Sequence, residues 1–158
     1  MTNNINIIES KQIKHNINTF TDIVYENFID LANYPLLKHT QEEIKKLMTS
    51  DKLYSVLVYN KNNSLIAYAL GEFMNLNDGR EVYYLSYIYV VSKYRKEGLG
   101  TKILNTIHTR CSNMGIKTIM LICDTEDKKV LDFYLFKGYM PDQVMRRYDR
   151  HDVLSLTL

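Results

Sequence analysis

Residues 94–101, Tyr-Arg-Lys-Glu-Gly-Leu-Gly-Thr, have the composition of a phosphate-binding turn. Its two glycines let the backbone approach an anion closely, because neither carries a Cβ. The apolar run at 82–91 predicts a buried strand before the turn, and 98–114 predict an amphipathic helix after it. The first N–H groups of a helix favour a bound phosphate, and Arg95 and Lys96 add full positive charges. This stretch therefore predicts a phosphate site.

The elements that must position this turn begin near the N-terminus. Residues 5–8 predict a short strand. Apolar residues at helical spacing predict an amphipathic helix from Ile17 that ends before Tyr34-Pro35. Thr40 and Glu43 form a capping-box signature, in which Thr40 caps a second helix and Glu43 reaches back.

Beyond residue 50 the pattern predicts a three-stranded antiparallel meander, followed by a helix, a strand, a helix and a final strand pair. These predicted elements cover residues 53–59, 64–73, 81–91, 98–114, 118–123, 128–136, 144–148 and 153–158. The strand at 81–91 has few polar positions, so we expect it to be central and covered on both faces. No linker or repeat divides the chain, so we expect a single α/β domain over residues 1–158, with a mixed α+β sheet.

The composition argues against several classes of function. A hydrophobic fraction of 46% and a charged fraction of 24% are typical of soluble globular proteins. A net charge of +2 is too small to argue for nucleic-acid or membrane binding. The chain shows no bilayer-spanning apolar run and no signal-peptide pattern, so we expect a cytoplasmic location. Cys111 and Cys123 lack metal-ligand spacing, so we expect no metal.

Two glycine-containing segments together resemble the GNAT superfamily of acyl-CoA N-acyltransferases. The central signature of that family, Arg/Gln-x-x-Gly-x-Gly/Ala between a strand and a helix, stands here as residues 95–100, Arg-Lys-Glu-Gly-Leu-Gly. Its second signature is an aromatic-Tyr pair, three residues, then Gly and an aromatic. Here it stands as residues 133–139, Phe-Tyr-Leu-Phe-Lys-Gly-Tyr. The resemblance implies a mostly antiparallel sheet, splayed between its fourth and fifth strands, with helices on both faces.

The resemblance also implies where acetyl-CoA would lie. Its pyrophosphate would lie on the backbone amides of residues 96–101, and its pantetheine arm along residues 88–90. Asp127 stands where the family often has Asn and would cap the helix beside the coenzyme. Tyr134 would direct its hydroxyl at the coenzyme sulfur as general acid. The implied coenzyme-binding residues are Ile88, Tyr89, Val90, Arg95, Lys96, Glu97, Gly98, Leu99, Gly100, Thr101 and Asp127.

The implied chemistry is direct attack of an amine on the thioester in a ternary complex. A backbone N–H near Tyr89 or Val90 can hold the resulting oxyanion, and the leaving thiolate benefits from a proton donor such as Tyr134. The amine must also lose a proton, and its acceptor stays open. The candidates are Glu81, Asp124, or a water held by Ser86 or Tyr87.

The resemblance implies a small-molecule primary amine as the acetyl acceptor. A protein lysine or N-terminus is an alternative, and so is a non-catalytic acyl-CoA-binding module. Residues 145–148, Met-Arg-Arg-Tyr, are similar to the C-terminal end of glucosamine-6-phosphate N-acetyltransferases, in which basic residues would bind phosphate. That sugar phosphate is therefore a narrower candidate. The acceptor, the acyl length and the oligomeric state stay open, although homodimers are common in the resembled family.

Overall fold

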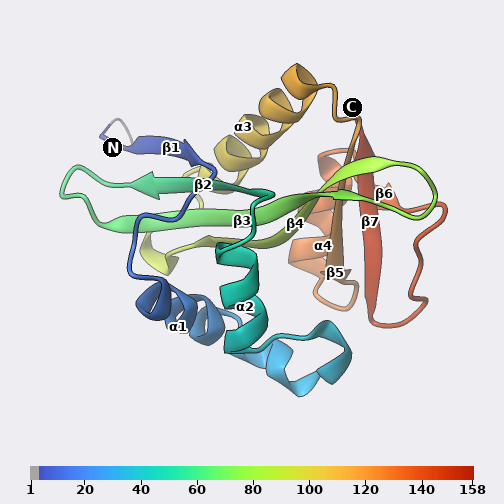
Figure 1. Cartoon of the computed structure of the whole chain (residues 1–158), viewed down its shortest axis with the longest axis horizontal. Coiled ribbons are helices and arrows are strands. Elements are labelled where there is room, and N and C mark those ends of the chain that lie inside the picture. Colours follow the sequence, from blue (N-terminus) through green and yellow to red (C-terminus); the bar gives the residue numbers. More distant parts are fainter. Residues whose placement is uncertain (1–3) are drawn as a thin grey trace.

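The computed structural model describes residues 4–158 and contains a seven-stranded sheet in the order β1-β2-β3-β4-β5-β7-β6 (Figure 1). The strands are β1 (Asn6–Ser10), β2 (Leu53–Tyr59), β3 (Leu65–Asn75), β4 (Glu81–Val90), β5 (Thr118–Asp124), β6 (Met140–Pro141) and β7 (His151–Thr157). Neighbouring strands are antiparallel except for β4 and β5, which are parallel. The mixed, mostly antiparallel sheet implied by the sequence is thus confirmed.

Helices cover both faces of this sheet. They are α1 (Ile17–Asn27), α2 (Gln41–Met48), α3 (Leu99–Met114) and α4 (Lys128–Phe136), with 3₁₀ helices η1 (Ile29–Asn33), η2 (Pro35–Leu37) and η3 (Ser92–Tyr94). Figure 1 shows α1 and α2 on the side of the sheet opposite to α3. Each side has its own apolar core: Val24 and Ile44 are fully buried on the α1–α2 side, and Ile103 and Ile107 on the α3 side. Within residues 4–158, no helix has both the length and the apolarity needed to cross a membrane.

The N-terminal half follows the sequence prediction only in part. The strand at 53–59 is confirmed residue for residue, and the Thr40 hydroxyl accepts a hydrogen bond from the Glu43 N–H at 3.1 Å. The Glu43 carboxylate does not reach back: the Thr40 N–H donates to the Lys38 carbonyl at 3.1 Å, and the carboxylate lies 3.5 Å from Lys46 Nζ. The first helix ends at Asn27, earlier than predicted, and continues as η1 and η2.

The predicted strand at 144–148 is wrong. Asp142 Oδ2 accepts hydrogen bonds from the N–H groups of residues 144 and 145, and Asp152 Oδ1 accepts them from those of residues 147 and 148. These backbone donors are consequently not available to a neighbouring strand. The segment between β6 and β7 is therefore an irregular loop that is held by two buried carboxylates.

The pairing of β4 with β5 is short. It comprises three residue pairs, Val82↔Thr118, Tyr83↔Ile119 and Tyr84↔Met120, after which the strands separate. In Figure 1, β5 and β7 run in a different direction from β1 to β4. The splay that the sequence implied between the fourth and fifth strands is therefore confirmed.

A β-bulge in β4 lies where the two strands begin to separate. Leu70 of β3 is opposite Tyr87, whereas Gly71 is opposite Leu85, so Ser86 is the extra residue. Because of this bulge, Leu85 and Ile88 both pack against the α3 core, although they are three residues apart. Tyr87 lies on the opposite face, against the α1–α2 core.

Gly71 is tightly packed beside this bulge. A Cβ at this position would stand 2.4 Å from the Tyr84 carbonyl oxygen and 2.5 Å from the Tyr83 ring. The Tyr83 ring is fully buried, and its hydroxyl donates a 2.7 Å hydrogen bond to the Tyr54 carbonyl. Neither neighbour can move without disturbing the sheet.

We therefore expect Gly71→Ala to lower the free energy of unfolding by about 2 kcal/mol, because one added methyl group overpacks the core. Urea unfolding measures this change. Gly100→Ala is a suitable control, because its Cβ would make an ordinary 3.5 Å contact with Phe133. Equal stability of Gly71→Ala and the wild-type protein would show that the packing at the bulge is looser than described.

Candidate active site

The turn between β4 and α3 has an unusual backbone conformation. Lys96 has φ of +68°, and Gly98 has φ of +80°. A side chain is strained at such angles, so the position of Gly98 favours glycine. Nothing lies within 4 Å of where its Cβ would stand, so the space outside the turn is open to a ligand.

The backbone donors of this turn form an array. None of the six consecutive N–H groups of residues 96–101 donates to an acceptor in the described part of the chain. The N–H of Lys102 donates to the Gly98 carbonyl at 3.0 Å, which begins the hydrogen bonding of α3. Consecutive free N–H groups at a helix N-terminus bind phosphate oxygens. The residues present therefore fit a pyrophosphate.

Arg95 ties this turn to the end of β4. Its Nε donates a 2.8 Å hydrogen bond to the Val90 carbonyl, and its guanidinium carbon lies 5.2 Å from the centre of the Tyr89 ring. Its charge is thereby held beside the opening between β4 and β5, a short distance along the chain from the free N–H groups.

The backbone of β4 faces this opening at alternate residues. The Val91 N–H donates to the Ile66 carbonyl on β3 at 2.9 Å. Because sides alternate along an antiparallel strand, the N–H and C=O groups of Val90 and Ile88 point away from β3, towards the opening. Those of Tyr89 point towards β3.

Tyr134 approaches the opening from α4. The helix begins at Asp127, whose carboxylate accepts a 3.3 Å hydrogen bond from the Val130 N–H. The Tyr134 side chain is 6% exposed and packs in the same core as Cys123. Burial raises the pKa of Tyr134 well above its usual value, and the nearby Cys123 thiol adds to the effect. Tyr134 is therefore a neutral hydroxyl that can donate a proton.

The Tyr134 hydroxyl has no hydrogen-bond partner within residues 4–158 and is not shut off from solvent. Its neighbour Tyr139 differs, because that hydroxyl lies 3.0 Å from His108 Nε2. The Cys123 thiol is neutral as well, since burial raises its pKa to about 11. Thiol nucleophilic catalysis therefore has no support here.

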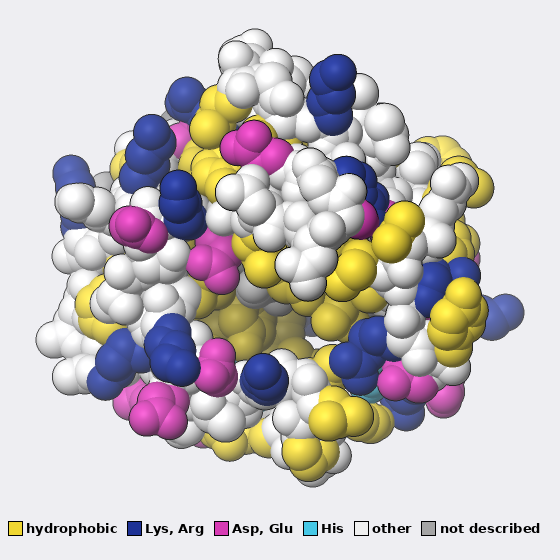
Figure 2. Space-filling model, turned by 45° about the vertical axis from the view of Figure 1, so that its right-hand side comes forward, with side chains coloured by type: hydrophobic (Ala, Val, Ile, Leu, Met, Phe, Trp, Pro, Cys, Tyr) yellow, Lys and Arg dark blue, Asp and Glu magenta, His cyan; other side chains and the backbone are white. Residues whose placement is uncertain are grey.

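The α1–α2 segment closes over the other side of the opening. Tyr34 packs edge-on against His151 at the start of β7, with ring centres 4.5 Å apart, and Arg150 lies over the Tyr34 ring. Phe28 packs against Tyr87 and Tyr89 of β4. Figure 2 shows a hollow near the centre of the view, lined by hydrophobic side chains and edged by charged ones.

A family comparison agrees with this geometry. The model of the acetyltransferase (GNAT) family matches residues 19–139, which is more than half of the chain and includes both the glycine turn and Tyr134. The chain belongs to the GNAT acetyltransferase family. It is accordingly an acyltransferase. None of the curated protein sequences compared with the chain matches it.

Solved structures show the same fold at low sequence identity. NAA60 from Arabidopsis thaliana, in complex with a bisubstrate analogue, has a TM-score of 0.73 at 11% identity, with 97% of this chain and 99% of that chain covered. PaiA N-acetyltransferase from Thermoplasma acidophilum, in complex with coenzyme A, has a TM-score of 0.67 at 13% identity, with 97% and 99% covered. An aminoglycoside acetyltransferase from an uncultured soil metagenomic sample has a TM-score of 0.68 at 17% identity, with 93% and 96% covered.

The two carboxylates that the sequence offered as proton acceptors are poorly placed in this GNAT acetyltransferase. Glu81 is exposed and begins β4 at the end where β4 and β5 are still paired. Asp124 ends β5, but Arg150 donates to both of its oxygens, at 2.9 and 2.8 Å. These bonds are the main cause that holds the pKa of Asp124 below its usual value, so it is a weak base.

The arginines of the β6–β7 loop are also paired. Arg146 donates to Asp152, Arg147 to Asp149 and Arg150 to Asp124, and Arg150 also forms a 3.6 Å ion pair with Glu126. Their charges are therefore partly neutralised within the protein. This arrangement gives no added support to a phosphate-binding role for the loop. Among the described residues, no group of three or more His, Cys, Asp and Glu side chains has a metal-binding arrangement.

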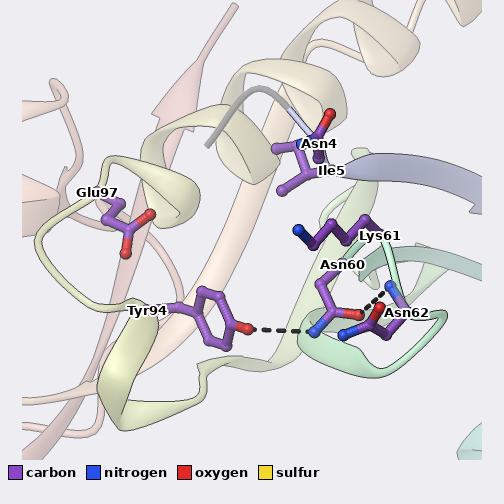
Figure 3. A pocket seen from close by; sticks show the side chains of 7 residues that line it. All are labelled: Asn4, Ile5, Asn60, Lys61, Asn62, Tyr94 and Glu97. Carbon is purple, nitrogen blue, oxygen red and sulfur yellow. Dashed lines mark hydrogen bonds between the residues drawn. The ribbon is translucent and has the colours of Figure 1, made fainter. Parts of the chain in front are cut away.

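A small pocket lies beside the glycine turn, with a volume of about 270 Å³. It is lined by Asn4, Ile5, Asn60, Lys61, Asn62, Tyr94 and Glu97. Figure 3 shows Tyr94 pointing towards Asn60, whose side-chain amide donates a 3.1 Å hydrogen bond to the Tyr94 hydroxyl. This contact joins the β2–β3 turn to the glycine turn and thereby supports the backbone conformation of the candidate site.

Asp142 anchors the β6–β7 loop that flanks the site. Its oxygens accept 2.8 and 2.9 Å hydrogen bonds from Arg80, together with one from the Ser155 hydroxyl. Arg80 is the main cause that holds the pKa of Asp142 well below its usual value. A carboxylate whose pKa is lower in the folded than in the unfolded state stabilises the fold. This contribution is complete above the unfolded pKa of about 3.9, and it is lost as the pH falls through the folded pKa.

We therefore expect Asp142→Asn to lower the free energy of unfolding by roughly 3 kcal/mol at pH 7. The difference from the wild-type protein should shrink as the pH falls below about 4, because Asp142 of the unfolded wild-type chain then takes up a proton, whereas the folded carboxylate, with its lower pKa, does not. Urea unfolding from pH 7 to pH 3 measures both effects. Glu126→Gln, which removes an exposed 3.6 Å ion pair, serves as the control and should leave the stability nearly unchanged. A constant difference at all pH values would contradict the role of ionised Asp142.

Proposed function

We propose that this protein is an acetyl-CoA-dependent N-acetyltransferase that acts on the primary amine of a small molecule, with residues 1–158 forming one catalytic domain. The observation that carries the proposal is the array of six free N–H groups at residues 96–101, directly beside the separated ends of β4 and β5. The array suits a pyrophosphate, and the separated strands leave backbone groups for an extended arm. Coenzyme A is a ligand that has both parts.

Each part of the site would have its own task. The N–H groups of residues 96–101 would hold the pyrophosphate, with Arg95 and Lys96 adding charge. The polar backbone groups of Ile88 would hold the pantetheine arm. At Val90 the carbonyl accepts from Arg95, and the N–H would hold the oxyanion. Bound acetyl-CoA supplies an activated carbonyl and a thiolate leaving group. Tyr134 would donate its proton to that thiolate.

The surroundings of the opening suit attack by a neutral amine. The side chains on the α1–α2 side are mostly aromatic, and the nearest described carboxylate on β5, Asp124, is held by Arg150. Because this carboxylate is already paired, it gives an ammonium group no counter-ion, and burial favours the deprotonated form that attacks the carbonyl. Longer acyl groups would have to fit the same space between β4 and β5.

A peptide amine is the second candidate acceptor. Among the similar structures, Naa50 from Arabidopsis thaliana holds the bisubstrate analogue CoA-Ac-MVNAL, in which a peptide is joined to the coenzyme. Its fold matches this chain with a TM-score of 0.70 at 15% identity. The supporting feature of this chain is the aromatic surface from Phe28, Tyr34 and Tyr87, which could contact a peptide side chain. A third candidate function is that of a non-catalytic acyl-CoA-binding module. Catalytic turnover with any acceptor would exclude it.

An acceptor panel tests the proposed reaction. It contains glucosamine 6-phosphate, polyamines, an aminoglycoside, a lysine peptide and a peptide with a free N-terminal Met, each with acetyl-CoA. Thiol release is measured together with the mass of the acetylated product. Acetylation of a small amine and not of the peptides would support the leading proposal. The reverse result would favour the second one, and acetyl-CoA binding without any turnover would favour the binding module.

Coenzyme binding has a separate test. Acetyl-CoA should raise the melting temperature of the wild-type protein, and this rise should disappear when Gly98 and Gly100 are both replaced by Val. The Gly98 side chain would fill the open space outside the N–H array, and the Gly100 side chain would press on Phe133 and shift the first turn of α3. Gly79→Val is a matched control, since Gly79 also has positive φ, +93°, and open space but lies in the β3–β4 turn. The control should keep the ligand-induced rise. A rise that persists in the double variant would contradict the assigned pyrophosphate site.

Tyr134→Phe tests the general acid. We expect kcat to fall by about 100-fold with little change in acetyl-CoA affinity, because only the proton donor is lost. Tyr139→Phe is the matched control, since that neighbouring buried tyrosine points its hydroxyl at His108 and should keep most of the turnover. Steady-state kinetics and calorimetric titration separate the two quantities. Unchanged kcat in Tyr134→Phe would exclude this role.

A further inference from the structure

His39 and Tyr87 form a hydrogen-bonded pair across two elements. His39 follows η2 and is 4% exposed, whereas Tyr87 lies in β4 beyond the end of the pairing with β5. The Tyr87 hydroxyl lies 2.8 Å from His39 Nδ1, and His39 Nε2 lies 3.0 Å from the Tyr25 carbonyl oxygen. The sequence around His39 contains a helix-capping signature but no catalytic motif, so the position of His39 beside Tyr87 became apparent only in the folded chain.

The two hydrogen bonds of His39 define the tautomer of its neutral ring. A carbonyl oxygen can only accept, so Nε2 carries the proton that is donated to Tyr25. Nδ1 of the neutral ring is then an acceptor, and the Tyr87 hydroxyl donates to it. The lone pairs of the Tyr87 oxygen consequently stay available to a further donor.

The pair lies where the acceptor amine must arrive. Tyr87 follows the bulge at Ser86 directly, and its neighbour Ile88 directs polar backbone groups into the opening. The Tyr87 ring packs against Phe28 on the α1–α2 side, opposite to the α3 core. A nucleophile entering from that side would meet Tyr87 beside the backbone that we assign to the thioester carbonyl.

We propose that Tyr87 and His39 form the proton relay that deprotonates the acceptor nitrogen. The nitrogen forms its bond to the acetyl carbon, and its proton moves to the Tyr87 oxygen while the Tyr87 hydroxyl proton moves to His39 Nδ1. The C–S bond then breaks, and the sulfur takes the Tyr134 proton. The positive charge that His39 then carries is stabilised by its hydrogen bond to the Tyr25 carbonyl and by the Tyr25 ring, which stacks on it with ring centres 4.9 Å apart. This inference rests on the proposed acetyl transfer.

The surroundings suit a relay through a neutral phenol. Burial is the main cause that raises the pKa of Tyr87 well above its usual value, with smaller effects of Tyr84 and Glu43. Tyr87 therefore stays protonated before and after the step: it takes the proton of the amine and passes its own hydroxyl proton to His39. The ionisable groups that bear on the pair are Tyr84 on β4, Glu43 on α2 and Tyr25 on α1.

Two other pairs of His and Tyr side chains in the described chain are also joined by a hydrogen bond and provide a comparison. His15 bonds to Tyr59 and His108 bonds to Tyr139. Tyr59 lies in β2, two strands away from β4, and the His108–Tyr139 pair lies on the α3 side. The position of the His39–Tyr87 pair beside the opening is therefore what singles it out.

Three variants test the relay, with Tyr59→Phe as the matched control that loses a His–Tyr bond elsewhere. Tyr87→Phe removes the first proton acceptor and keeps the ring on Phe28. His39→Asn keeps an acceptor atom near Nδ1, and His39→Gln keeps a donor near Nε2, but neither can take up a proton. Thiol release is measured with the amine that the panel identifies, or with water where no amine reacts. Melting temperature and acetyl-CoA affinity are measured for every variant.

The relay predicts that kcat falls by about 100-fold in Tyr87→Phe and in both His39 variants, while acetyl-CoA affinity stays unchanged. Tyr59→Phe should retain wild-type kcat. Wild-type kcat in Tyr87→Phe, or in a folded His39→Asn, would overturn the relay and leave the acetyl transfer standing. A wild-type protein that binds acetyl-CoA and releases no thiol with any amine or water would overturn the transfer, and the relay with it.

Discussion

The early end of the parallel pairing between β4 and β5 is the constraint on which the rest of the site depends. A parallel pair needs a crossover connection, here α3, which leaves from the carboxyl end of β4. The N-terminus of α3 and its free N–H groups therefore lie at the end where the strands separate. The same separation leaves the polar groups of Ile88 and Val90 without a strand partner.

The two faces of the sheet contribute different groups to the surroundings of the opening. On one side, the turn at 96–101 presents free backbone donors and Tyr134 contributes a neutral hydroxyl. On the other side, the α1–α2 segment places aromatic rings and His39 next to β4. Ion pairs such as Asp124–Arg150 stand at the edges and orient the strand ends. Tyr87 and Tyr134, which flank the opening, are neutral because burial raises the pKa of each, and the charges of Arg95 and Arg150 lie at its edges. Neutral groups beside the reacting atoms suit a reaction in which a neutral amine replaces a thiolate.

Local patterns predicted the regular elements well and the irregular ones poorly. The strand at 53–59 and the helix at 128–136 have strong apolar and aromatic patterns, and the structure has the same bounds. The predicted strand at 144–148 has a weaker apolar pattern, with two central arginines, and it forms a loop because Asp142 and Asp152 accept hydrogen bonds from its backbone N–H groups. Those contacts join residues that only folding brings together, so neighbouring residues along the chain could not indicate them.

The sequence by itself determined the family and the order of most elements. It also singled out the turn at 96–101, which we propose for the coenzyme, because glycine at positive φ and free N–H groups at a helix start are local properties of that turn. Only the tertiary structure decided which groups lie beside the opening between β4 and β5. Glu81 and Asp124 were the nearest carboxylates along the chain, but the first lies at the paired end of β4 and the second is bound by Arg150. The side chain that meets Tyr87 comes from His39, 48 residues away in sequence. A hydrogen bond between such distant residues depends on how α1, α2 and β4 pack, and no short motif encodes it.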